Sequence, residues 1–408
     1  MLYPDASEVV DGRLSIGGCD ARELTREFGT PLYVVAEDDL RAKAREFTAA
    51  MGGGEVVYAS KAFPCTAVLR VFREEGLSVD VASGGELALA QRAGFEGNRI
   101  VFHGNAKSEA ELRAAAEIGA RIVVDNFDDV DKLDRIGAPA TVFIRVTPGV
   151  VADTHAKILT GHAGSKFGLS IEQARIAIER LSDASWANLR GLHMHIGSQL
   201  FDLEPWRLAV EALSTLGDFP AYDLGGGLAV AYTPDRRPPT VTEWVGEMRR
   251  AADDLLGPAK ELSVEPGRAL VASAGVTLYT VESVKDVELP DGRVRFVAVD
   301  GGMSDNMRPM LYDAPYDADL VDRVGGAGST CTVVGKHCES GDVLIRETAL
   351  PDPRPGDVLA TPVTGAYVYA MANNYNGVPR PPVVFCTNGN ARVVVRRETY
   401  EDLYGRDV

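Results

Sequence analysis

The chain of 408 residues is longer than one ordinary domain and fits one large domain with a smaller one. Its 59 Asp and Glu outnumber 42 Lys and Arg, giving a formal net charge of −17. This balance argues against nucleic acid and anionic membrane surfaces as partners, because both need clustered basic residues, and leaves small molecules as the expected partners. The five cysteines form no CxxC pair, so we expect neither disulfides nor a zinc ribbon, and a cytoplasmic location. Neither a membrane span nor a signal peptide is predicted.

From residue 55 onward, short apolar runs alternate with amphipathic segments. The runs are residues 55–61, 77–83, 99–105, 121–126, 141–146, 191–197, 221–227 and 262–267. Apolar residues three and four apart predict helices between them, as at 65–76, 84–94, 108–119, 171–183 and 241–257, with another at 38–51 before the first run. Eight strand signals separated by helices predict an α/β fold, a (β/α)8 TIM-type barrel over residues 29–270. An open doubly wound sheet is the structural alternative.

After about residue 270 the helical period disappears. β-branched runs broken by Gly and Pro follow at 276–284, 293–300, 330–337, 342–349, 381–387 and 391–399. They predict a mostly antiparallel β-domain over residues 271–408, which we expect residues 1–28 to join.

Chemically active residues follow the predicted barrel strands, at the C-terminal ends where barrels build their active sites. They are Lys61, His103, Arg145, His193, His195, Gly225, Gly226, Gly227, Glu265 and Arg268. Three consecutive glycines let backbone N–H groups approach an anion, and the loops after strands seven and eight often hold phosphate. A tight turn is the alternative reading of the glycines alone.

Lys61 and Glu265 each allow two interpretations. A site that favours the neutral amine would let Lys61 form a Schiff base with an aldehyde cofactor. Otherwise Lys61 is a lysine that reaches solvent from a strand end. Glu265 needs a cationic partner, which is either a protonated heterocyclic nitrogen or an arginine such as Arg268.

His193 and His195 flank Met194 and therefore point to the same side of a strand. Such a pair suits two metal ligands, with a carbamylated Lys61 as a bridge, or one histidine stacked on an aromatic cofactor and one structural histidine. Zinc sites need three or four ligands, and no aspartate ends the eighth strand, so we expect no metal. If the histidine pair did bind metal, the protein would instead be a metal-dependent barrel hydrolase, and this remains the alternative.

An ordered series of motifs resembles the fold type III, alanine racemase-like decarboxylases that use pyridoxal 5'-phosphate (PLP), most closely the diaminopimelate decarboxylases. The motifs run from "TPLYVVAEDDL" through "YASKAF", "DVASGGEL", "GSKFGLS", "HMHIGSQ", "DLGGGL", "EPGRALV", "DGGMSDNMRPMLY" and "CESGD" to "GAYVYAMANNYNG". The resemblance implies PLP as the cofactor, an amino-acid carboxy-lyase activity, and a homodimer with shared active sites.

The resemblance also implies a role for each matching cofactor residue. Lys61 would form the Schiff base with PLP, His195 would stack on the ring, and Glu265 would pair with the ring nitrogen. Tyr367 would contact cofactor or substrate. The phosphate would be held by Gly225, Gly226, Gly227, Gly267 and Arg268.

Further residues of the resemblance concern proton transfer and substrate. Cys338 and Glu339 would reach the partner subunit's site, with Cys338 as the proton donor. Arg308 and Tyr312 match contacts to a distal carboxylate, with help from Arg268, and Glu339 would take the distal amine. A guanidinium binds a carboxylate through paired hydrogen bonds and repels an ammonium.

The expected reaction is therefore the decarboxylation of meso-diaminopimelate to L-lysine, the last step of lysine biosynthesis. Decarboxylation of ornithine, lysine, arginine or a secondary-metabolite precursor is the alternative. A PLP-binding regulator without catalysis is disfavoured, because Lys61, Cys338 and the second domain are all present.

Overall fold

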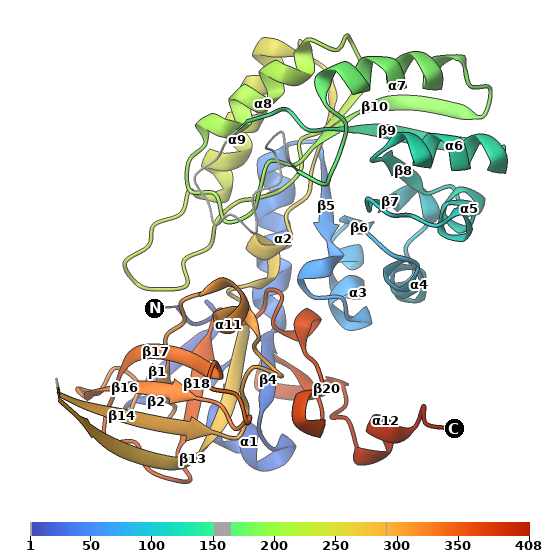
Figure 1. The fold of residues 1–408 in the computed structure, drawn as a ribbon. Coiled ribbons are helices and arrows are strands. Elements are labelled where there is room, and N and C mark those ends of the chain that lie inside the picture. Colours follow the sequence, from blue (N-terminus) through green and yellow to red (C-terminus); the bar gives the residue numbers. More distant parts are fainter. Residues whose placement is uncertain (1, 151–164, 291) are drawn as a thin grey trace. The chain divides into compact units, whose positions relative to one another are not determined.

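The computed structural model describes residues 2–150, 165–290 and 292–408 (Figure 1). The chain forms two compact units. The barrel unit comprises Arg41–Val230 and Arg237–Leu270, and the β unit comprises Met1–Leu40, Ala231–Arg236 and Val271–Val408. Residues 29–40 and 231–236 thus group with the β unit, although the sequence analysis assigned them to the barrel domain. Gly164, the first residue of the "GSKFGLS" motif, lies outside the described residues.

The strands of the barrel unit close into a barrel in the order β10-β11-β12-β5-β6-β7-β8-β9. Their bounds are β5 Glu55–Ala59, β6 Ser78–Val81, β7 Ile100–Phe102, β8 Arg121–Val124, β9 Ala140–Val146, β10 Ala187–Met194, β11 Ala221–Asp223 and β12 Glu261–Val264. Parallel pairing of β12 with β5, with Ser263 opposite Glu55, closes the barrel. Each expected strand is present, so the barrel is confirmed and the open doubly wound sheet is excluded.

A buried apolar layer fills the barrel interior. It consists of Val57, Val101, Val123, Phe143 and Ala221, contributed by β5, β7, β8, β9 and β11. Side chains of a barrel's strands pack in such layers, so the barrel is a solid core and its chemistry is confined to the strand ends and loops.

One helix of this region, α2, precedes β5, and the others each follow a barrel strand in sequence (Figure 1). They are α2 Glu37–Met51, α3 Thr66–Glu74, α4 Gly84–Ala93, α5 Glu109–Glu117, α6 Phe127–Ile136, α7 Ile171–Asp183, α8 Glu204–Ser214, α9 Val241–Leu255 and α10 Arg268–Val271. Reciprocal side-chain and backbone hydrogen bonds at Ser108, Ser170 and Thr240 fix the starts of α5, α7 and α9. In the part of the chain that the structure describes, no helix has the length and apolar character needed to cross a membrane.

Aromatic contacts join three of these helices. The ring of Trp244 in α9 lies 6.1 Å from Phe47 of α2 and 5.7 Å from Trp206 of α8, both edge-on. Such pairs contribute about 1 kcal/mol each beyond the burial of apolar area. They secure the helices that flank the strands carrying the glycine loop and Glu265.

The β unit is built on a mostly antiparallel sheet with the path β17-β16-β14-β13-β4-β19-β20, with β18 beside β13 and β15 beside β18. The bounds are β4 Leu32–Ala36, β13 Gly275–Leu289, β14 Gly292–Val299, β15 Asp319–Leu320, β16 Ser329–Val334, β17 Val343–Leu350, β18 Val358–Pro362, β19 Val383–Thr387 and β20 Asn390–Val395. The unit also holds β1 Ser7–Val10, β2 Arg13–Ile16, β3 Cys19–Asp20, α1 Ala21–Phe28, α11 Arg308–Tyr312 and α12 Tyr400–Tyr404. The predicted presence of a mostly antiparallel β-domain is confirmed.

Strand β4 explains why residues before the barrel belong to this unit. Leu32–Ala36 is buried along its whole length and pairs with β13 on one side and β19 on the other. A fully buried strand has the same apolar pattern in either unit, so periodicity alone does not assign it. Its long-range pairing makes it a central strand of the sheet.

Candidate active site

A buried carboxylate lies at the C-terminal end of the barrel. Glu265 follows β12 and is 6% exposed. Its Oε1 lies 2.6 Å from Nε2 of His103, which follows β7, and its Oε2 lies 3.0 Å from Nε2 of His193 in β10. Burial alone would raise the pKa of Glu265, but its contacts with the two histidines hold that pKa well below its usual range. Glu265 is therefore a buried anion at neutral pH.

The two histidines are neutral donors to this anion. Burial lowers the pKa of His103 to about 4, against the opposing pull of Glu265, and burial also lowers the pKa of His193. A neutral imidazole that faces a carboxylate oxygen at hydrogen-bond distance carries its proton on that nitrogen. His103 and His193 thus each donate Nε2–H to Glu265, and Glu265 keeps its negative charge.

The two histidines of the expected pair make different hydrogen bonds. Nδ1 of His195 accepts a hydrogen bond from the Gly226 N–H at 3.2 Å, away from the Glu265 contacts of His193. Among the described residues, the group of potential metal ligands is His103, His193 and Glu265, whose ligand atoms lie within 4.8 Å of one another. Both Nε2 atoms already face the carboxylate as donors, so the arrangement favours a hydrogen-bonded anion over the metal alternative.

Lys61 lies immediately after β5, in the 3-10 turn Ser60–Ala62, and its side chain is exposed. Its charge acts on Asp80, a buried residue of β6 that the sequence analysis missed. Burial raises the pKa of Asp80 to about 8, with Lys61 opposing the rise and Glu265 adding to it. The sequence did contain a signal for Asp80, because an aspartate inside the apolar run "LSVDVAS" is unusual. Charged residues are rarely buried without a partner.

His195 joins the same electrostatic cluster. Burial is the main reason that its pKa lies well below the ordinary value, and the charges of Lys61 and Arg145 lower it further. Lys61, His195 and Glu265, which the sequence placed at three different strand ends, are therefore electrostatically coupled at one end of the barrel.

The glycine loop after β11 packs where only glycine fits. A Cβ atom on Gly225 would lie 2.2 Å from the carbonyl oxygen of Met194, and one on Gly226 would lie 2.1 Å from that of Glu265. Gly227, with φ +125°, would place its Cβ 2.5 Å from the Gly197 oxygen. The backbone of this loop is thus held directly against the ends of its neighbouring strands. The Gly225 N–H donates to Oδ1 of Asp223 at 2.9 Å, and the Gly226 N–H donates to Nδ1 of His195.

The second phosphate-binding candidate lies after β12. A Cβ on Gly267 would lie 2.9 Å from that of Ala59, so this residue also packs tightly against the end of β5. Arg268 begins α10, is 6% exposed, and donates from Nη2 to Oγ of Ser198 at 2.9 Å. Ser198 belongs to the quoted "HMHIGSQ" motif but was not singled out from the sequence.

The remaining candidates lie in the β unit. Arg308 begins α11 and is 6% exposed. Its Nη1 donates to the hydroxyl of Tyr316, and its guanidinium carbon lies 4.6 Å from the ring centre of Tyr232 and 5.6 Å from that of Tyr316. Burial would lower the pKa of Arg308, but the facing tyrosines raise it above its ordinary value. Neither tyrosine was identified from the sequence.

Tyr312 and Tyr367 are half-buried in the same unit. Tyr312 ends α11, the helix that Arg308 begins. Tyr367 has φ +66°, a conformation that a bulky side chain rarely adopts, and it acts electrostatically on Arg308. Strain of this kind tends to persist at functional sites.

Cys338 and Glu339 are exposed, whereas the other four cysteines are buried. Hydrogen bonds hold their loop in place. The Cys338 N–H donates to Oδ1 of Asn376 at 3.1 Å, and the His337 N–H donates to Oδ2 of Asp342 at 2.9 Å. Asn376 and Asp342 were not identified as candidates from the sequence.

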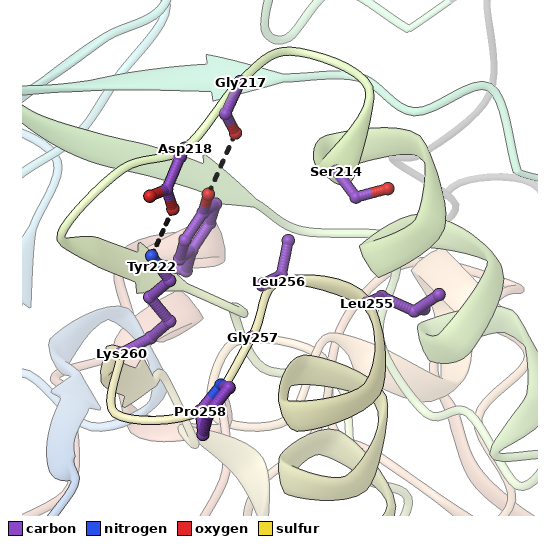
Figure 2. Close-up of a pocket in the computed structure, with 9 residues that line it drawn as sticks. All are labelled: Ser214, Gly217, Asp218, Tyr222, Leu255, Leu256, Gly257, Pro258 and Lys260. Atoms are coloured by element: carbon purple, nitrogen blue, oxygen red, sulfur yellow. Dashed lines mark hydrogen bonds and ion pairs between the residues drawn. The ribbon is translucent and has the colours of Figure 1, made fainter.

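A separate hollow of about 370 Å³ lies at the start of β11 and β12, the opposite strand end from Glu265. Figure 2 shows its lining, in which the hydroxyl of Tyr222 donates to the Gly217 oxygen at 3.2 Å and Lys260 pairs with Asp218. None of the candidate site residues lines it. Conserved chemistry in barrels sits at the C-terminal strand ends, so this hollow is not the candidate active site.

Comparisons with known proteins agree with this geometry. The family model described as "Pyridoxal-dependent decarboxylase, pyridoxal binding domain" matches residues 37–272. The diaminopimelate decarboxylase of Bacillus subtilis is 46% identical over 433 residues, which cover 100% of this chain and 98% of that protein. The diaminopimelate decarboxylase of Mycobacterium tuberculosis is 44% identical over 425 residues, which cover 97% of this chain and 95% of that protein.

Solved structures extend the similarity to three dimensions. The crystal structure of diaminopimelate decarboxylase from M. jannaschii superposes with a TM-score of 0.93 and 34% sequence identity, covering 100% of this chain and 99% of that chain. The same enzyme in complex with L-lysine gives the same values.

Proposed function

Because the chain belongs to the family of pyridoxal-dependent decarboxylases, we propose that it is a PLP-dependent carboxy-lyase that converts meso-diaminopimelate to L-lysine and CO2. The observation that supports meso-diaminopimelate as the substrate is the similarity to diaminopimelate decarboxylases along the chain, at 46% identity over 100% of its length. The reaction is the last step of lysine biosynthesis.

The residues at the barrel end fit PLP. Glu265 is a buried anion held by two neutral donors, which suits a protonated ring nitrogen. The tightly packed glycine loop suits a phosphate group, because its backbone approaches neighbouring atoms more closely than any Cβ would allow. When bound, PLP accepts the electrons that the substrate releases as CO2 leaves.

We assign the chain's own residues to the following tasks. The amine of Lys61 would bind the aldehyde group of the cofactor, and His195 would contact the cofactor ring. Glu265 would accept a hydrogen bond from the protonated ring nitrogen. Phosphate contacts come from Gly225, Gly226, Gly227, Gly267 and Arg268.

The β unit supplies proton transfer and substrate contacts in this proposal. The Cys338 thiol gives a proton to the α-carbon after CO2 has left. Arg308 and Tyr312 bind the distal carboxylate, with Arg268, and Glu339 binds the distal amine. Tyr367 contacts cofactor or substrate, and its strained backbone supports a functional role.

The proposed assembly is a homodimer in which Cys338 and Glu339 act in the partner subunit's site. Their exposure supports this assignment. We further propose that the cofactor-binding domain lies within residues 29–270, since the family model covers residues 37–272. The β-domain is formed by residues 271–408 together with the N-terminal segment that includes β4. The five free cysteines support a reducing, cytoplasmic location.

The test is CO2 release by the purified protein with added PLP. We compare meso-diaminopimelate, L-lysine, L-ornithine and L-arginine at equal concentrations. Strong preference for meso-diaminopimelate, with L-lysine as the product, is the expected result. Preference for one of the other three amino acids would leave the family assignment intact and overturn the proposed substrate.

A further inference from the structure

The surroundings of Arg308 differ from those of two other buried cations, Lys107 and Arg145. Lys107 is paired with Asp129 at 2.7 Å, and Arg145 lies 3.7 Å from Asp125. Arg308 is equally buried, yet no acidic side chain of the described ranges lies within ion-pair distance of it. Burying a charge is costly unless something compensates for it.

Two tyrosines provide that compensation. The ring of Tyr232 lies 4.6 Å from the guanidinium carbon of Arg308, within the range of a cation–π contact. Tyr316 accepts a hydrogen bond from Nη1 through its hydroxyl, and its own ring lies 5.6 Å away. The two rings contact each other edge-on, with centres 5.3 Å apart and planes at 79°. Both tyrosines are 4% exposed, so the arrangement is part of a packed interior.

Aromatic rings and a carboxylate compensate a cation in different ways. A carboxylate neutralises the charge and occupies the paired N–H groups of the guanidinium. Ring faces and one hydroxyl stabilise the charge without cancelling it. Within the described ranges, the side chain of Arg308 donates only through Nη1, which leaves Nε and Nη2 for an external acceptor.

We propose that Tyr232 and Tyr316 are positioning residues for Arg308. They stabilise its buried positive charge without neutralising it, so that Arg308 selects substrates with a distal carboxylate. This inference rests on the proposed function and deepens it. Tyr232 supplies the ring face and Tyr316 supplies the hydroxyl that fixes the guanidinium plane. The missing counter-anion is the distal carboxylate of the substrate, which a guanidinium binds through two parallel hydrogen bonds.

The test uses the PLP-loaded enzyme and three variants: Tyr316→Phe, Tyr232→Phe and Tyr232→Leu. Tyr316→Phe removes only the hydroxyl, and Tyr232→Leu removes the ring. We expect each of these two to raise KM for meso-diaminopimelate about tenfold while kcat stays within about twofold, since a binding contact is lost. Tyr232→Phe keeps the ring face and should behave like the unmodified enzyme. Tyr222→Phe, a buried tyrosine beside the hollow at the other strand end, is the matched control.

A second readout does not depend on turnover. Pimelate, the seven-carbon diacid without amino groups, is added to the loaded enzyme, and its effect on the thermal unfolding midpoint is measured. Pimelate should raise that midpoint in the unmodified enzyme and in Tyr222→Phe, and less in Tyr316→Phe. Circular dichroism checks that each variant is folded.

The outcomes separate the two proposals. If the unmodified enzyme does not turn over meso-diaminopimelate, the proposed function fails. If it does, but Tyr316→Phe and Tyr232→Leu leave KM and the pimelate response unchanged, the positioning role is overturned. A parallel fall in kcat on every substrate, without a change in KM, would also overturn it, because that pattern indicates a general structural role.

Discussion

The barrel unit and the β unit each bury a charged side chain, and each stabilises that charge with neutral polar or aromatic groups. The buried charge is negative at Glu265 in the barrel unit and positive at Arg308 in the β unit. Glu265 is held by two neutral imidazoles that donate hydrogen bonds to it. Arg308 is held by two tyrosine rings and one hydroxyl that accepts a hydrogen bond. In neither case does the primary contact carry the opposite charge.

The difference from an ordinary buried ion pair is instructive. The Lys107–Asp129 pair, also in the barrel unit, satisfies both of its charges internally and has no need of a ligand. Breaking such a pair leaves an isolated buried charge, which is strongly destabilising. Glu265 and Arg308 instead keep their charges for an outside group. The proposed occupants are the ring nitrogen of PLP for Glu265 and the distal carboxylate of the substrate for Arg308.

The largest expected effect is on the barrel side. Lys61→Ala should remove the visible absorption of lysine-bound PLP and reduce turnover at least about 10³-fold, since the covalent attachment point is lost. Spectroscopy and CO2 release measure both. Lys43→Ala, at a half-buried lysine of α2 paired with Glu46, is the control and should change neither. Retention of the absorption band in Lys61→Ala would refute the assignment of Lys61.

Cys338→Ala tests the β unit's contribution to chemistry. PLP binding should persist, while turnover should fall by about 10²- to 10³-fold, because a positioned proton donor is removed. Proton incorporation at the α-carbon can be followed in D2O.

Mixing inactive Lys61→Ala and Cys338→Ala chains sharpens the comparison further. A mixed dimer would carry one site with both residues intact, so part of the activity should return. Each variant incubated alone is the control. The cross-subunit assignment would be abandoned if verified mixed dimers stayed inactive.

Arg308→Ala should lower kcat/KM for meso-diaminopimelate by about 10²-fold, since a charge-assisted bidentate contact is lost. Arg308→Lys keeps the charge without the planar fork and should restore only part of the loss. Steady-state kinetics with meso-diaminopimelate and L-lysine provide the measurement. Equal losses on both substrates would show that Arg308 is structural and would break its analogy with Glu265.

His103→Gln tests whether His103 is neutral beside Glu265, through the pH dependence of the free energy of unfolding. The pKa of His103 falls to about 4 in the folded chain, against about 6.5 in the unfolded chain. Between these values the unfolded chain binds more protons, so His103 makes stability decline as the pH falls from about 6.5 to 4. The glutamine variant should lose less stability over that window, on the order of 2 kcal/mol. Denaturant unfolding at pH 4.5 and pH 7 measures this, and identical pH slopes would contradict a neutral buried His103.

The candidate site was predictable where the signal is local. Lys61 and Glu265 each end an apolar run, and Gly225 to Gly227 form a visible triplet, so strand-end reasoning identified them. Tyr232 and Tyr316 give no such signal, because a tyrosine near a turn is ordinary until the fold brings it to Arg308. The same holds for Asn376, which matters only because its side chain accepts from the Cys338 backbone.

The sequence by itself determined the strands and most helices of the barrel, the β-rich character of residues 271–408, and the motif series that identifies the family. These features depend on periodicity and on short fixed spacings, which survive without knowledge of packing. Tertiary structure alone decided that β4 lies between β13 and β19, that His103 and His193 both contact Glu265, and that two tyrosines hold Arg308. Apart from the contact of Arg308 with Tyr316, which lies 8 residues further along the chain, these contacts join residues far apart in the sequence, and only folding brings them together.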